Sequence, residues 1–267
     1  MKTYLNLGLL IIGLLIPSTL TAQNLPSGET IAAKTYDQPD GISVTRKLSM
    51  ELIDKRGKTR IRETTTLRKY FGEEKRMAIF YISPKNVKGT AFLTFDYPDP
   101  SLDDDQWLYM PALRKTRRIS AANRGDYFLG TDITYEEIKL EARISKDDYS
   151  YKTIAKEELD GRMCYAVEGT PINAAVAKEL GYSKVKFWVD AELWMLRKAD
   201  IWDIAGNHLK TIEIHDIKQV QGFWTYHKIV ANNHKTKHTT IFRFSDIDYK
   251  ATISDDTFSK ETLVNGL

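Results

Sequence analysis

The sequence predicts an antiparallel fold of the α+β or mainly-β class, built as either a strongly curved sheet or an open barrel. From residue 41 onward, apolar and polar side chains alternate with period two, which is typical of strands with one buried face. Turn sequences such as Asp160-Gly161 separate these runs at hairpin spacing, whereas helical patterns are few and short. Many strands with a few short helices favour an antiparallel architecture.

The first two predicted strands form a hairpin. Every second residue of the first strand points to one face, and this set is Val44, Arg46, Leu48, Met50 and Leu52. The turn at residues 54–57 leads into a second strand over residues 58–71, which is rich in threonine and arginine.

The next three predicted strands differ because both of their faces are apolar. They cover residues 77–82, 91–95 and 107–110. Such a strand must be covered on both sides, by protein on one and by protein or a ligand on the other. If the chain has a ligand cavity, we expect it beside these strands.

The second half of the chain predicts a meander. Strands are expected near residues 184–189, 196–204, 208–220, 223–231 and 238–245, with turn sequences between them.

Three short helices are expected. Ser27 is a candidate cap for a helix over residues 29–36, and Thr134 with Glu137 has capping-box spacing before a helix over residues 134–140. A third helix is expected over residues 172–180, opened by the preceding proline and closed by the following glycine.

The N-terminus predicts export. Lys2 precedes an apolar run over residues 5–16, and small residues then lead to an expected cleavage site before Gln23. We therefore expect a signal peptide over residues 1–22 and one domain over residues 23–267. An uncleaved anchor is the alternative, which the shortness of the run disfavours.

Composition excludes several function classes. A net charge of +3 over 267 residues is too even for a general nucleic-acid binder. The single cysteine, Cys164, excludes an internal disulfide, and its apolar neighbours favour a small buried side chain over a nucleophile. No nucleophile elbow, phosphate loop, dinucleotide-binding pattern or zinc-protease motif occurs. We expect no catalytic residues, metal or cofactor.

Two possible metal patterns are weak. The acidic run at residues 103–105 lacks the alternating ligands and glycine of a calcium loop. His234 and His238 have a spacing found in metal sites, but they fall in a polar segment rather than on a helix.

The most informative feature is an apolar strand that is followed directly by a cluster of cationic residues. Trp107 and Tyr109 share one face of this strand, and Leu108 and Met110 share the other. Either one of these pairs lines a cavity or both lie in a core. The cations that follow are Arg114, Lys115, Arg117 and Arg118, which either contact a lipid headgroup or a partner or form a solvated surface. In an extended strand Arg117 and Arg118 point opposite ways, so we expect one to turn inward and pair with Asp132 or Glu136.

The chain resembles the LolA-like outer-membrane lipoprotein-sorting proteins, in the subgroup often associated with RND-type transporters. The resemblance covers the chain from about residue 41 to the C-terminus. It rests on Pro84, residues 88–91, the stretch from Asp105 to Leu113, residues 117–119 and the stretch from Gly130 to Glu137.

The resemblance implies an incomplete β-barrel, lidded by short helices, whose concave face holds acyl chains of a lipid or lipoprotein in the periplasm of a Gram-negative bacterium. It also implies an RND-type inner-membrane transporter as partner and transient membrane contact; we expect a monomer. Candidate cavity residues are Phe80, Phe92, Phe95, Trp107, Tyr109, Phe128 and Trp188. The leading hypothesis is a non-enzymatic carrier that delivers its ligand toward the outer membrane. The alternatives are an envelope ligand-sensing or scaffold module, and an enzyme acting on lipid or glycan.

Overall fold

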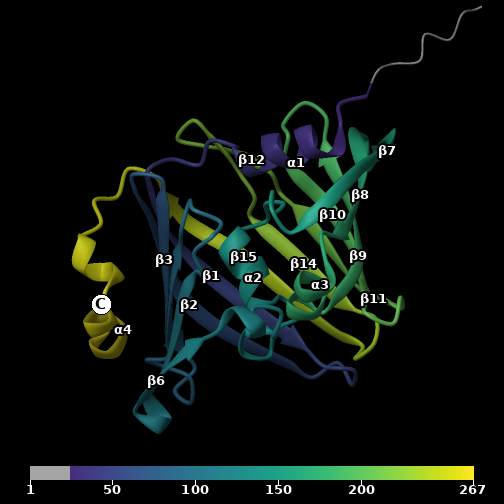
Figure 1. Ribbon diagram of the computed structural model, residues 1–267. Coiled ribbons are helices and arrows are strands. Elements are labelled where there is room, and N and C mark those ends of the chain that lie inside the picture. The colour runs from purple at the N-terminus through teal and green to yellow at the C-terminus, as the bar shows by residue number, and fades with distance from the viewer. Residues whose placement is uncertain (1–24) are drawn as a thin grey trace, which may run out of the picture.

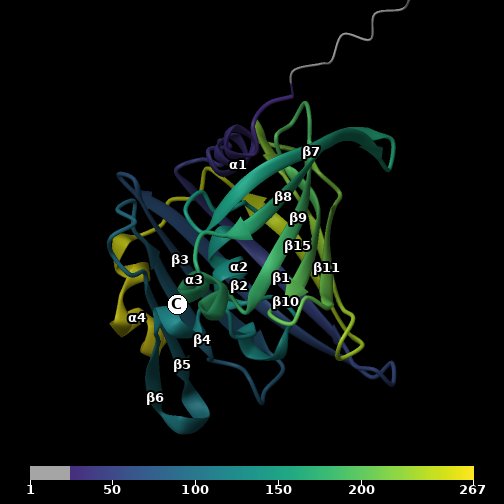
Figure 2. The same ribbon diagram turned by 45° about the vertical axis from the view of Figure 1, so that its right-hand side comes forward.

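One curved sheet of thirteen strands dominates the molecule. The computed structural model describes residues 25–267, and over this range the sheet has the order β6-β5-β4-β3-β2-β1-β15-β14-β11-β10-β9-β8-β7. Its neighbouring strands all pair antiparallel. The sheet curves around a hollow without closing (Figures 1 and 2), since β6 and β7 form its two edges. The predicted fold class is confirmed.

The strands divide into two meanders. The first contains β1 (Ser43–Ile53), β2 (Thr59–Phe71), β3 (Glu74–Ser83), β4 (Ala91–Asp96), β5 (Asp105–Met110) and β6 (Lys115–Ile119). The second contains β7 (Tyr149–Leu159), β8 (Arg162–Pro171), β9 (Tyr182–Asp190), β10 (Leu196–Asp203), β11 (His208–His215), β14 (Lys228–Asn233) and β15 (His238–Asp248). The meanders join in the middle of the sheet, where Met50 of β1 pairs with Phe242 of β15.

The predicted long strand over residues 208–220 is interrupted. After β11 the backbone turns at Asp216, whose φ of 55° lies in the left-handed region. Two short strands, β12 (Lys218–Val220) and β13 (Phe223–Thr225), then form a separate two-stranded sheet. The predicted strand over residues 223–231 is divided in the same way, between β13 and β14.

The helices are short. Ser27 caps α1 (Gly28–Tyr36), as predicted, and Thr134 and Glu137 form the complete capping box of α2 (Tyr135–Leu140). The helix predicted from residue 172 begins later, as α3 (Ala174–Leu180), because the preceding proline ends β8 and Asn173 is the cap. A further helix, α4 (Lys260–Asn265), follows a 3-10 turn, η4 (Asp255–Phe258), and was not predicted.

The strands with two apolar faces, β3, β4 and β5, are covered on both sides, as their pattern predicts. Met77 and Ile79 of β3 belong to the main core on the concave side of the sheet. Phe80 of β3 points the other way, into a second core closed by Phe258 of η4 and Leu263 of α4. In Figure 1 the C-terminal segment accordingly lies outside the sheet, beside β3. Protein therefore covers both sides.

Candidate functional site

An apolar cavity lies between the concave face of the sheet and the segment that carries α2. Its volume is about 100 Å³, which is room for several water-sized molecules and less than the roughly 300–1,000 Å³ of pockets that hold drug-sized ligands. Side chains from both meanders form its wall, including Leu48, Met77, Ile79, Val185, Phe187, Ala199, Ile201, Ile212, Ile214, Ile229, Phe242 and Phe244. These alternate residues point inward because each strand presents one face to the hollow.

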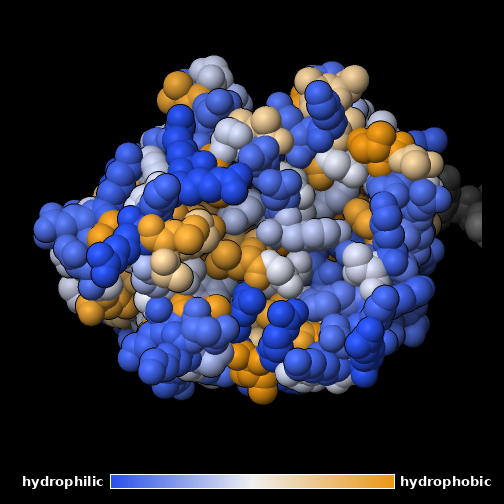
Figure 3. Space-filling view, turned by 90° about the horizontal axis from the view of Figure 1, so that it is seen from below, coloured by the Kyte–Doolittle hydropathy of each residue, from blue (hydrophilic) through white to orange (hydrophobic). Residues whose placement is uncertain are grey.

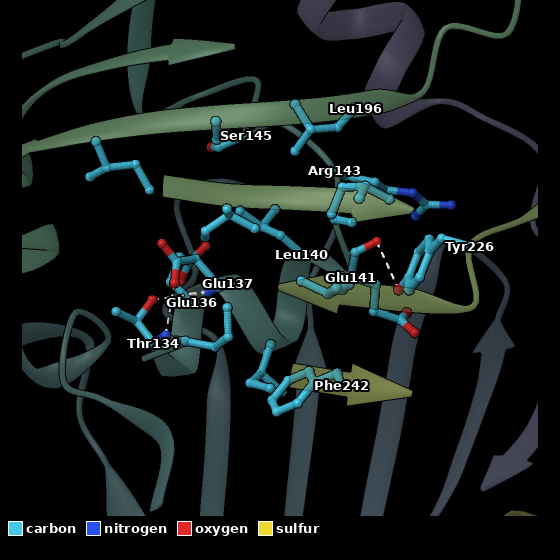
Figure 4. Close-up of a pocket in the computed structure, with 18 of the residues that line it drawn as sticks. Thr134, Glu136, Glu137, Leu140, Glu141, Arg143, Ser145, Leu196, Tyr226 and Phe242 are labelled. Carbon is cyan, nitrogen blue, oxygen red and sulfur yellow. Dashed lines mark hydrogen bonds between the residues drawn. The ribbon is translucent and has the colours of Figure 1, made fainter. Parts of the chain in front are cut away.

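Helix α2 lies inside the hollow (Figures 1 and 2) and covers the cavity with Ile138 and Leu140. It belongs to the segment that crosses from β6, at one edge of the sheet, to β7, at the other. Its capping-box residues Thr134 and Glu137 lie at one end of the cavity, with Glu141 and Tyr226 at the other (Figure 4).

Buried ion pairs fix the N-terminal part of α2 to the sheet. Lys210 of β11 is fully buried and donates to the Glu137 carboxylate at 2.7 Å and to the backbone carbonyl of Asp132 at 2.8 Å. Burial lowers the pKa of Lys210, although Glu137 opposes the shift. Tyr182 also donates to Glu137, at 2.9 Å.

A second set of ion pairs holds the middle of α2. Glu136 lies 2.9 Å from the Lys139 ammonium group, which also bonds to Asp104. Arg124 lies 3.7 Å from Glu136 and donates to Asp148 at 2.6 Å. Burial raises the pKa of Glu136 despite these two cations.

A third set surrounds the residue that ends α2. Glu141 pairs with Arg46 of β1 and lies 3.6 Å from Arg68 of β2, while Arg143 lies 2.5 Å from Asp40. Burial alone raises the pKa of the Glu141 carboxyl, but Arg46, Arg68 and other cations outweigh it and lower that pKa to about 2. Glu141 is therefore ionised inside the protein at neutral pH.

Beside this cluster lies a second, smaller hollow of about 60 Å³. It adjoins the cavity, because Arg46, Glu141, Arg143, Leu196 and Tyr226 line both. The two spaces differ in chemistry. Apolar side chains from many strands surround the larger one, whereas the wall of the smaller one includes Asp40, Arg46, Arg68, Glu141 and Arg143.

A family model described only as "uncharacterized protein" matches residues 73–265, which is most of the chain. A solved domain assigned to outer membrane lipoprotein sorting, from Vibrio parahaemolyticus, has 26% identity and a TM-score of 0.79, covering 89% of this chain and 98% of its own. The chain belongs to the family that this model describes, and its fold is similar to that of the solved lipoprotein-sorting domain. A DUF1329 family protein from Desulfovibrio piger is similar at 26% identity and a TM-score of 0.80, covering 88% of this chain and 97% of its own.

The LolA-like fold extends to a more distant structure. A LolA superfamily protein from Nitrosomonas europaea has 20% identity and a TM-score of 0.66, covering 89% of this chain and 99% of its own. No curated protein matches the sequence.

The seven predicted cavity residues do not line the cavity. Phe80 and Trp107 belong to the second core, with Phe95 and Tyr109 packed against it. Trp188 packs on Cys164 and Ala166, in a third small cluster. That any of these five residues contacts a ligand stays a prediction.

Phe92 and Phe128 belong to the main core, on the concave side of the sheet. Their ring centroids are 5.2 Å apart, and both rings contact Tyr135 at the start of α2. They support the helix that covers the cavity rather than facing the cavity itself.

The four predicted contact cations lie together on the surface. Arg114, Lys115, Arg117 and Arg118 are exposed on or beside the edge strand β6. This strand lies at the lower end of the molecule in Figure 1, and the view from below shows hydrophilic residues around apolar patches (Figure 3).

The expected inward turn of Arg117 or Arg118 is wrong. Arg118 pairs on the surface with Asp105, at 2.6 Å. Asp132 instead bonds to His238 and Thr240, and Glu136 is occupied by other cations. Arg117 and Arg118 point to opposite faces of β6 and both are exposed, so the core covers neither face of the strand at these positions.

Cys164 is buried among apolar side chains. Burial raises the pKa of the Cys164 thiol to about 11, which leaves little thiolate at neutral pH. Over residues 25–267, no three His, Cys, Asp or Glu side chains gather in a way that would hold a metal ion. Within the same range, no helix has the length and apolar character needed to cross a membrane. The predicted signal peptide lies outside the described residues.

The buried charges around α2 were not predicted as a site. Arg46 could have indicated a buried ion pair, because it was the only charged residue on the otherwise apolar face of the first predicted strand. Its partner Glu141 lies 95 positions away, and alternation within one strand does not reveal such a contact.

Proposed function

We propose that this protein is a periplasmic, non-enzymatic carrier that binds an acyl chain of a lipid or lipoprotein under α2 and delivers it toward the outer membrane. The observation that carries the proposal is the apolar cavity on the concave face of a LolA-like sheet. Burial of a methylene group contributes about 0.8 kcal/mol, so an acyl chain gains affinity with every carbon that enters.

The size of the cavity sets a requirement for loading. About 100 Å³ accepts only part of a long acyl chain. A longer chain needs α2 and its flanking segment to shift away from the sheet. An RND-type transporter in the inner membrane is proposed as the partner that promotes loading.

Native mass spectrometry of protein isolated from the periplasm tests the proposal. We expect a bound species with the mass of a lipid or acylated peptide. Protein that is consistently free of ligand and binds none in vitro would contradict the carrier and favour a sensing or scaffold module.

A cavity-filling variant tests the location. Ala199 is buried and lines the cavity, so Ala199→Phe is expected to lower binding of a fluorescent fatty acid at least tenfold. Ala155 of β7 lies outside the cavity, against the small Cys164 cluster, and Ala155→Phe is the matched control. Equal binding by both variants, each shown to be folded by circular dichroism, would place the ligand elsewhere.

A further inference from the structure

We infer that the arginine cluster at the end of α2, formed by Arg46, Arg68 and Arg143, binds the anionic oxygen-bearing head of the amphiphile whose chain occupies the cavity. The inference rests on the proposed carrier function and adds to it the chemical class of the ligand: an acyl chain that ends in a carboxylate or phosphate, rather than a neutral lipid.

The charges of this cluster do not balance among themselves. The three arginine side chains are at most 10% exposed, and the carboxylates that pair with them are Glu141 and Asp40. Among the residues in direct contact, three cations against two anions leave one positive charge in a largely buried place, and the ion pair of Lys75 with Asp96 beside the cluster adds no net charge. Buried charges are costly unless paired, so an added anion is favoured here.

Several polar atoms of the cluster are buried without a hydrogen-bond partner. They include Nε of Arg46 and Nε of Arg68. The nearest carboxylate oxygen to Arg68 Nε is Glu141 Oε2, at 3.6 Å, which is beyond hydrogen-bonding distance. Oxyanions are strong acceptors for guanidinium groups, so a carboxylate or phosphate satisfies donors that the protein leaves unpaired.

Glu141 Oε2 and the Thr66 hydroxyl also lack partners. Thr66 lines the cavity close to this end, beside residues of β1 and β3. A head group that carries a hydroxyl, such as a monoprotonated phosphate ester, donates to the carboxylate while its other oxygens accept from the arginines.

The position of the cluster suits the junction between a head and a chain. Arg46, Glu141 and Arg143 line both the apolar cavity and the smaller hollow beside it. In the close-up, Arg143 and Glu141 lie with Tyr226 at one end, away from the capping residues of α2 (Figure 4). A chain in the cavity therefore places its head among the arginines, with the smaller hollow beyond them.

Isothermal titration calorimetry with three probes tests the inference: dodecyl phosphate below its micelle concentration, dodecanol below its solubility limit, and inorganic phosphate. We expect the unmodified protein to bind dodecyl phosphate at least tenfold more tightly than dodecanol, because hydrogen bonds to charged groups are the strong ones. Inorganic phosphate, which lacks the chain, is expected to bind at least a hundredfold more weakly than dodecyl phosphate.

Variants assign the effect to the cluster. Arg143→Gln is expected to reduce the preference for dodecyl phosphate at least fivefold, and Arg143→Lys to retain most of it. Arg162→Gln is the matched control, because Arg162 also pairs with carboxylates but lines neither space. The Arg162→Gln variant is expected to prefer dodecyl phosphate over dodecanol as strongly as the unmodified protein does.

Each contrary outcome has a distinct meaning. Equal binding of dodecyl phosphate and dodecanol by the unmodified protein overturns the head-group inference and leaves the carrier intact, whatever the folding of the variants. Inorganic phosphate bound as tightly as dodecyl phosphate indicates a free-anion site and also overturns it. Failure of both dodecyl probes to bind overturns the carrier itself.

Discussion

At the scale of single residues, Arg46 and Glu141 show what a sequence pattern contains and what it lacks. Alternation places Arg46 on the same face as Leu48 and Met50, and the structure confirms that this face is buried. A buried arginine requires a carboxylate, but the identity of that carboxylate depends on how α2 crosses the hollow. Burial was therefore predictable from the sequence, and the pairing was not.

The acid stability of the protein is expected to depend on Glu141. Its pKa falls from a usual 4.5 to about 2 in the folded protein, so its ionised form stabilises the fold by on the order of 3 kcal/mol above pH 4.5. This contribution is lost as the pH falls from 4.5 toward 2. Urea unfolding between pH 5 and pH 2 measures it.

Glu141→Gln is the comparison for that experiment. The variant is less stable at neutral pH, because Arg46 loses its charged partner, and its stability should change less between pH 4.5 and pH 2. The same pH dependence in both proteins would show that other carboxyls control acid unfolding.

At the scale of elements, the sequence contained strong local signals for where a helix begins, but it did not indicate where that helix packs in the fold. The spacing of Thr134 and Glu137 predicted the capping box of α2, because both of its bonds form within one turn. The location of α2 over the cavity depends on long-range ion pairs such as that of Glu137 with Lys210. Helix α4 also has local signals, with Ser259 at its N-cap and Gly266 after its last residue, but they went unrecognised, and its packing on the second core fixes its position.

The second core is expected to support stability rather than binding. Leu263 of α4 is 1% exposed within it, so Leu263→Ala should reduce the free energy of unfolding by about 2–5 kcal/mol. Its neighbour Val264 is 44% exposed, and Val264→Ala should cost less than about 0.5 kcal/mol.

Thermal unfolding together with fatty-acid binding checks this prediction. A large loss of affinity in folded Leu263→Ala protein would indicate that the second core, with Trp107, contributes to the ligand site after all.

At the scale of the whole molecule, the fold class followed from alternation and turn spacing, whereas the cavity wall did not. The pattern identified strands with two apolar faces, but it did not say which face turns toward the hollow. Met77 lies inside it and Phe80 outside, although both satisfy the same pattern. The aromatic residues were therefore reasonable candidates whose side of the sheet only the complete topology reveals.

The exposed cations on and beside β6 are expected to attract the whole molecule to an anionic membrane surface. Each Lys or Arg near an anionic membrane contributes about 1 kcal/mol, so Arg117→Glu should weaken binding to phosphatidylglycerol-containing vesicles about fivefold to thirtyfold at low salt. Vesicle co-sedimentation measures this, with Lys55→Glu in the β1–β2 turn as control. Unchanged binding would leave these cations the simpler role of keeping the β6 edge from pairing with other chains.

The pairing of β1 with β15 has a consequence for how the molecule forms. β1 is the first strand along the chain, and it cannot pair with its second neighbour, β15, until residues 238–248 have been synthesised. Until then a long strand keeps an unpaired edge, which is the kind of surface that templates aggregation. Contacts between distant parts of a chain also slow folding. Refolding of the protein should consequently be slow and concentration-sensitive, and in the cell the nascent chain would depend on protection by chaperones until its last strand arrives.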